Sequence, residues 1–191
     1  MKQQSKMKQT EIEKVFEELK LNNLINKKSQ LLCNNSESNL RGTRNKIYYH
    51  PLFANLNKNN LRFLLLHEEA HNTTFQNSTW VLILSFVSGL VSYFFLRHIF
   101  FSIIILFFVF FLFRGFIKKD ELNADLLSAE KLKKYYHILS PSKIMKDTIM
   151  EFSKIECKRN FRSKFSSIII KILGYHPPFE ERIKIIKRKV G

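Results

Sequence analysis

Two long apolar runs in the middle of the chain limit its possible folds more than any other feature. They cover residues 80–96 and 99–113, and only Arg97 and His98 separate them. A bilayer normally requires about 20 apolar residues per helix, and flanking residues can extend each run into a short span. We therefore predict a transmembrane helical hairpin over residues 79–117.

The first apolar run also carries small residues at three- and four-residue spacings, namely Ser85, Ser88, Gly89 and Ser92. A stripe of small side chains lets a second helix approach closely. A buried hairpin inside a water-soluble domain is the alternative, but little else in a chain of 191 residues could cover it.

The charged residues indicate how such a hairpin would be oriented. The net charge is +16, and the basic residues lie mainly outside the apolar block. Arg114, Lys118 and Lys119 follow the second run directly. Because positive residues favour the cytoplasmic side, we expect an integral membrane protein of the cell membrane with two transmembrane helices and both termini in the cytoplasm. Anionic lipid head groups would attract its basic part.

Several other classes of protein fit poorly. The positive charge comes without a known nucleic-acid-binding pattern, so we expect no nucleic-acid partner. Cys33 and Cys157 have no metal-ligand spacing and are expected to be unpaired thiols in a reducing compartment. Residues 1–10 lack the apolar core of a signal peptide.

The first part of the chain predicts a helix, a loop and a strand. Thr10 and Glu13 form a capping-box pattern, and apolar residues at helical spacing follow to about Leu24. This amphipathic helix, assigned to residues 1–28, could pack on the rest of the protein or lie on the membrane surface. Residues 34–45 are typical of a loop, and residues 46–52 of a short edge strand that ends at a proline. The fold class is therefore mainly α with a small β element (α+β).

A short histidine motif lies in a predicted helix over residues 61–72. His67, Glu68 and His71 form an HExxH sequence. The four-residue spacing places both imidazoles on one helical face, where they can bind one Zn²⁺, with Glu68 placed to take a proton from the attacking water. The alternative is two surface histidines on an amphipathic helix.

A catalytic zinc needs a third protein ligand, and the chain offers one after the second apolar run. Glu121 and Asp125 share one face of a helix predicted over residues 120–136. A membrane hairpin would return this helix to the side that carries HExxH, so Glu121 would be a ligand and Asp125 would orient an imidazole. The alternative is a solvated helix start beside Lys118 and Lys119.

The remaining sequence predicts two further helices. One begins at Ser140-Pro141-Ser142 and continues to about Ile155, and the last is a basic helix from about Phe179. A turn at His176-Pro177-Pro178 precedes it.

The order of these motifs resembles that of a known peptidase family. HExxH is followed by paired apolar helices, by an ExxAD helix from Glu121 to Asp125, and by an HPxxxxRI sequence from His176 to Ile183. Together they look like the HtpX-like and type I CAAX prenyl protease family of gluzincin peptidases. The resemblance covers about residues 46–183.

The resemblance implies a role for each motif residue. The zinc ligands, for one Zn²⁺ per chain, would be His67, His71 and Glu121. Glu68 would be the general base and acid, and Asp125 would be the partner of a ligand. His176 would stabilise the oxyanion, or simply mark a turn before the two prolines, and Arg182 would support the site electrostatically. The strand that pairs with an extended substrate would contain Ile47, Tyr48 and Tyr49.

The predicted function follows from this resemblance and from the hairpin. We expect a membrane-anchored zinc-dependent endopeptidase that hydrolyses membrane or misfolded proteins by direct attack of water. Its zincin-like catalytic domain would comprise residues 29–78 and 118–191, interrupted by the hairpin, with the active site at the cytoplasmic surface. Its partners would be protein or peptide substrates and the lipid bilayer. The alternative is a non-catalytic membrane protein that binds metal or regulates a partner.

Overall fold

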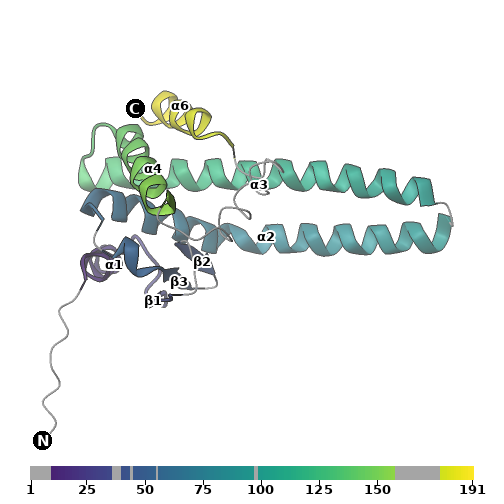
Figure 1. The fold of residues 1–191 in the computed structure, drawn as a ribbon, viewed down its shortest axis with the longest axis horizontal. Helices are drawn as coiled ribbons and strands as arrows, with labels where there is room; N and C mark the ends of the chain where they lie inside the picture. The colour runs from purple at the N-terminus through teal and green to yellow at the C-terminus, as the bar shows by residue number, and fades with distance from the viewer. Residues whose placement is uncertain (1–9, 36–39, 44, 55, 97–98, 158–176) are drawn as a thin grey trace, which may run out of the picture.

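The protein is mainly helical with one small sheet, as the sequence predicts. The computed structural model describes residues 10–35, 40–43, 45–54, 56–96, 99–157 and 177–191, and only some of the side chains between 73 and 113 (Figure 1). The elements in chain order are α1 (Glu11–Leu21), β1 (Gln30–Cys33), β2 (Arg41–Thr43), β3 (Lys46–Tyr49), η1 (Pro51–Phe53), α2 (Lys58–Leu96), α3 (Ile99–Tyr136), α4 (Pro141–Cys157) and α6 (Phe179–Lys189).

The first helix, α1, packs on the body of the protein. The backbone N–H of Thr10 donates to the Glu13 carboxylate over 2.7 Å, as the capping-box pattern predicts. The apolar face that contains Val15 and Leu19 is fully buried. The helix ends earlier than predicted because Asn23 has a φ of 55°, in the left-handed region.

The sheet has three strands in the order β1-β3-β2. β1 pairs parallel to β3, and β2 pairs antiparallel to it. β3 is therefore the central strand, and the prediction that it lies at the edge is wrong. β2 lies within residues 34–45, which the sequence predicts as a loop. The sequence does not predict this strand because the segment contains Gly and Asn residues, which are typical of turns. Asn45, with a φ of 66°, does lie in the turn before β3.

Two long antiparallel helices, α2 and α3, form the predicted helical hairpin (Figure 1). The sequence predicts a separate HExxH helix before the first apolar run, but both belong to α2. Neither proline nor glycine occurs in the polar residues that join them, so the helix continues. α3 likewise continues from the second apolar run past Glu121, although Gly115 lies inside it. Arg97 and His98 lie outside the described residues.

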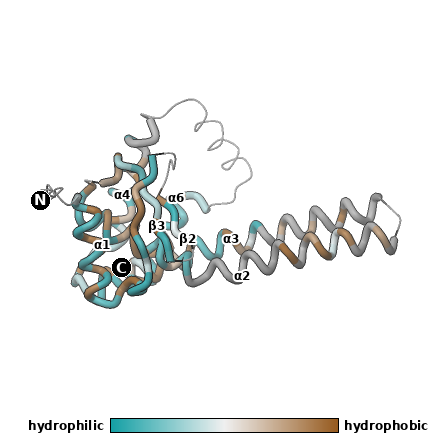
Figure 2. Tube along the Cα trace, turned by 90° about the horizontal axis from the view of Figure 1, so that it is seen from below, coloured by the Kyte–Doolittle hydropathy of each residue, from teal (hydrophilic) through white to brown (hydrophobic). Residues whose placement is uncertain are grey.

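The structure does not support the predicted transmembrane character of the hairpin. Among the residues that it describes, no helix is both long and apolar enough to cross a membrane. Large apolar side chains along both helices are nevertheless exposed. Figure 2 colours several residues of the hairpin as hydrophobic. The described part of residues 79–117 thus lies in two helices, and its transmembrane role stays a prediction.

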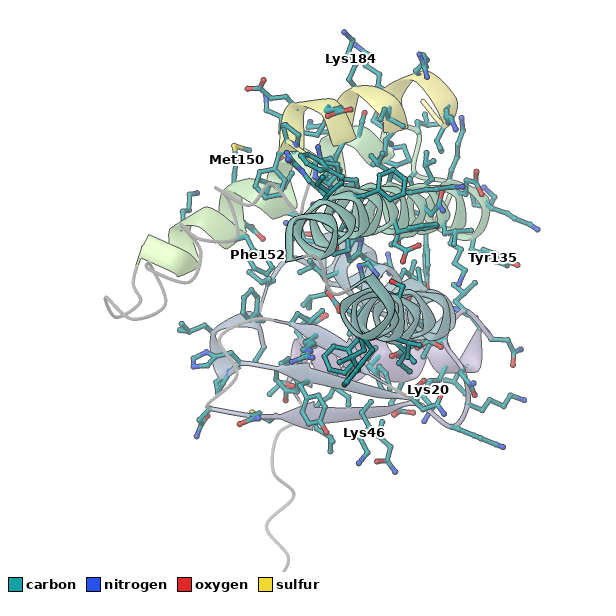
Figure 3. All side chains as sticks on the ribbon, turned by 90° about the vertical axis from the view of Figure 1, so that its right-hand side faces the viewer. Lys20, Lys46, Tyr135, Met150, Phe152 and Lys184 are labelled. Atoms are coloured by element: carbon teal, nitrogen blue, oxygen red, sulfur yellow. The ribbon has the colours of Figure 1, made fainter. Side chains whose placement is uncertain are left out.

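The core lies at one end of the hairpin. Seen along the hairpin, α2 and α3 lie between the sheet on one side and α6 on the other, with α4 beside them (Figure 3). Different elements contribute fully buried side chains, among them Phe53, Leu65, Leu132, Met145 and Ile186. This packing fixes α2 against α3 where HExxH and Glu121 lie. The division into catalytic segments 29–78 and 118–191 stays a prediction.

Candidate metal centre

Three side chains that could hold a metal ion converge between α2 and α3. The Nε2 atoms of His67 and His71 are 3.0 Å apart. Oxygen atoms of Glu121 lie 3.3 Å from the His71 Nε2 and 3.7 Å from the His67 Nε2. The four-residue spacing on α2 brings the imidazoles together, and the packing of α3 against α2 adds the carboxylate.

The spacing of these atoms fits a tetrahedral metal site. Bonds of about 2.0–2.1 Å to a tetrahedral Zn²⁺ place its ligand atoms about 3.3 Å apart. The donor atoms, which all lie within 4.8 Å of one another, have close to that separation. Two imidazoles and a carboxylate also leave the fourth position that a catalytic zinc needs for water. The residues present therefore fit the metal.

Asp125 and Arg182 lie next to the candidate metal ligands. The Asp125 carboxylate lies 3.0 Å from the Nδ1 atom of His67. The same carboxylate accepts two hydrogen bonds, of 2.6 and 2.7 Å, from Arg182. Burial raises the pKa of Asp125, but the hydrogen bonds from Arg182 and the nearby His67 ring outweigh it, so the pKa is lowered. Asp125 is thus held as a carboxylate that can orient the His67 ring.

Arg182 also reaches the third member of the candidate metal group. Its Nη2 atom lies 3.3 Å from the Glu121 carboxylate, and the guanidinium is buried. One cation therefore faces two carboxylates on the same side of α3.

Glu121 also shifts the pKa of His71. Burial lowers the pKa of His71, but the hydrogen bond and the charge of Glu121 outweigh this effect and raise the pKa.

Glu68 points toward the sheet. Its Oε2 atom accepts a hydrogen bond of 2.6 Å from the backbone N–H of Gly42 in β2. Burial raises the pKa of Glu68, against the lowering effects of His67 and His71. Gly42 is not among the residues predicted from the sequence, where its one signal is a lone glycine in a polar segment shortly before a predicted strand.

Glu69, the next residue, points to another part of the molecule. Its buried carboxylate accepts hydrogen bonds from the Asn26 backbone N–H over 2.9 Å, and from Ser29 and Asn72 side chains over 3.2 Å each. The segment between α1 and β1 is thereby attached to the HExxH helix. No periodicity in the sequence indicates this contact.

The residues predicted to pair with an extended substrate do not lie at an edge of the sheet. Ile47, Tyr48 and Tyr49 belong to β3, which is paired on both sides and so offers no free backbone edge to a substrate. The sheet edge near Glu68 is β2 instead. His176 lies outside the described residues, and Arg182 lies on α6.

The site thus combines a histidine pair on one helix, a carboxylate on the next and a further glutamate beside them, an arrangement suited to metal-assisted hydrolysis. The sequence model of peptidase family M48 matches residues 8–190. The chain therefore belongs to peptidase family M48, a family of metal-dependent peptidases. The comparisons with curated proteins and with solved structures give no match.

Proposed function

We propose that the protein is a zinc-dependent endopeptidase that hydrolyses peptide bonds in membrane or misfolded proteins. Membership of peptidase family M48 supports peptide hydrolysis. The observation that carries the proposal is the convergence of donor atoms from His67, His71 and Glu121 to within 4.8 Å of one another, with Glu68 on the same helix. Two nitrogen donors and one carboxylate suit Zn²⁺, one ion per chain.

Each residue around this group has a role in the proposed mechanism. When bound, the cation supplies the Lewis acidity that lowers the pKa of a coordinated water and polarises the peptide carbonyl. Glu68 takes the proton of the attacking water on its carboxylate and returns it to the leaving amine. Asp125 keeps the His67 ring oriented, and Arg182 offsets the negative charge of Glu121. The resemblance adds His176 as the group that stabilises the oxyanion.

The proposal is tested by removing either the metal or one ligand. The purified full-length chain loaded with Zn²⁺ should cleave casein and retain one zinc per chain, and a chelator should abolish cleavage. Glu121→Ala should lower the affinity for zinc at least about 10-fold, because it deletes one of three protein ligands. Metal content is measured by atomic absorption after dialysis, beside Glu130→Ala as a control on the exposed side of α3.

Two results would contradict the proposal. Cleavage that continues in excess chelator would exclude a metal-dependent reaction. Equal zinc content in Glu121→Ala and in the unchanged protein would remove Glu121 from the site. A chain that binds zinc through these residues but cleaves no protein would instead agree with a non-catalytic metal-binding role.

We also propose that the hairpin associates with the lipid bilayer and holds the metal centre at the cytoplasmic face of the cell membrane. The support is the row of large apolar side chains on α2 and α3 that are 60% or more exposed, namely Phe86, Phe94, Ile104, Phe108 and Phe111. Contact with lipid would remove this surface from water, at about 25 cal/mol per Å². The basic residues that flank the hairpin suit anionic head groups.

Flotation with anionic lipid vesicles tests this association. The full-length chain should float with the vesicles, and the double substitution Phe94→Asp with Phe108→Asp should lower the floated fraction strongly. Leu139→Asp is the matched control, because Leu139 is 83% exposed but lies outside the hairpin. Equal flotation of the two variants would exclude the hairpin as the lipid contact.

A further inference from the structure

Gly42 lies directly against the HExxH helix. Its backbone N–H donates to the Glu68 carboxylate over 2.6 Å, a short distance typical of a hydrogen bond to a charged acceptor. Gly42 pairs in register with Ile47, and β2 as a whole is held by β3. The donor is therefore part of a paired strand and not of a free side chain, so its direction is fixed by the sheet.

The same position has no room for a side chain. A Cβ atom built on Gly42 would lie 2.4 Å from the backbone oxygen of Glu68 and 3.3 Å from the Asn72 side chain. The first distance is far shorter than van der Waals contact, and the atom that it meets is helix backbone, which cannot rotate away. Only glycine lets β2 approach α2 closely enough for this hydrogen bond.

We propose that Gly42 is a positioning residue, whose N–H holds the Glu68 carboxylate in the direction needed for proton transfer. This inference rests on the function proposed above, in which Glu68 is the general base. The carboxylate of a glutamate lies beyond three side-chain torsions and is otherwise free to turn. A less well oriented carboxylate lowers the rate of the chemical step. In this role Gly42 acts through Glu68 and is not itself a catalytic residue.

The contact can be tested without any measurement of activity. The chain contains 5 glycines, so ¹⁵N-glycine labelling of the zinc-loaded full-length protein gives a simple spectrum. The Gly42 signal is assigned by its loss in Gly42→Ala. An amide proton that is hydrogen-bonded to a carboxylate resonates downfield of its usual position. Glu68→Gln should therefore move the Gly42 signal upfield, whereas Glu69→Gln should leave it in place. A Gly42 signal that does not respond to Glu68→Gln would overturn the inference.

The role is tested by kinetics on a fluorescent casein substrate. Gly42→Ala should lower kcat about 10- to 100-fold, since displacing a catalytic group by about 1 Å has an effect of that size, with KM and zinc content unchanged. The matched control is Gly89→Ala, because a Cβ at Gly89 meets nothing within 4 Å. Its kcat should equal that of the unchanged protein.

A second variant covers the case in which Gly42→Ala fails to fold. Replacing Gly42 by glycolic acid exchanges the amide for an ester, which deletes the N–H and adds no atom that could collide with α2. The same fall in kcat at unchanged KM supports the positioning role, and full kcat in the ester overturns it. If the unchanged protein cleaves no casein, the proposed function fails, and the glycine spectrum still decides whether Gly42 holds Glu68.

Discussion

Glu68 and Glu69 are adjacent and chemically identical, but α2 directs them to different surroundings. Glu68 faces β2, on the same helix as the candidate metal ligands, and accepts a hydrogen bond from a strand N–H. Glu69 faces the segment between α1 and β1 and accepts hydrogen bonds from Asn26, Ser29 and Asn72. A rotation of about 100° per residue along the helix is enough to separate the two environments.

The difference shows how one helix can carry both a reactive group and the attachment that holds it. The donors around Glu69 come mainly from a segment distant in sequence, so this carboxylate ties the N-terminal part of the fold to α2. Glu68 is buried less completely, and one hydrogen bond leaves its other oxygen available. We therefore expect the same substitution, glutamate to glutamine, to affect activity at one position and stability at the next.

The largest effect is expected for Glu68→Gln. An amide cannot take the proton of the attacking water, so kcat on casein should fall about 10³-fold, within the usual range for a lost general base. Its carbonyl oxygen can still accept the Gly42 hydrogen bond, so zinc content and the midpoint of thermal unfolding should not change. Unchanged proteolysis would refute the role of Glu68, and a large loss of stability would remove the contrast with Glu69.

A smaller effect, and on a different quantity, is expected for Glu69→Gln. The amide group of glutamine would face donors in a buried site, so the free energy of unfolding should fall by about 2 kcal/mol. Denaturant titration measures this change, with Glu68→Gln as the matched control. The activity per folded molecule should be retained. A variant as stable as the unchanged protein, or one that is stable but inactive, would contradict the assignment of Glu69 to stability alone.

Features that depend on local periodicity could be predicted from the sequence. The capping box at Thr10, the buried face of α1 and the start of α6 at Phe179 need only neighbouring residues, and the structure has them. The same holds for the shared helical face of His67 and His71. Pairing them with Glu121 required the resemblance and the helical hairpin, because α3 reaches them only through tertiary packing.

Features that depend on contacts between distant segments could not be predicted. β2 is three residues long and its glycine is typical of a turn, so only pairing with β3 reveals it as a strand. The same pairing moves β3 from the edge to the centre. Glu69 looks like an arbitrary member of the HExxH motif, since two of its three donors lie about forty residues away in sequence.

The smallest effect is expected at one of those donors. The Ser29 hydroxyl is buried and donates to Glu69 over 3.2 Å, so Ser29→Ala removes one hydrogen bond but leaves the donors from Asn26 and Asn72. The free energy of unfolding should fall by about 1 kcal/mol, less than for Glu69→Gln. Asn35→Ala, at an exposed polar residue beyond β1, is the control and should have no measurable effect. In the double variant with Glu69→Gln, the loss of unfolding free energy should be smaller than the sum of the losses in the two single variants, because both substitutions act on one hydrogen-bonded group. Full additivity in denaturant titration would mean that Ser29 stabilises the fold independently of Glu69.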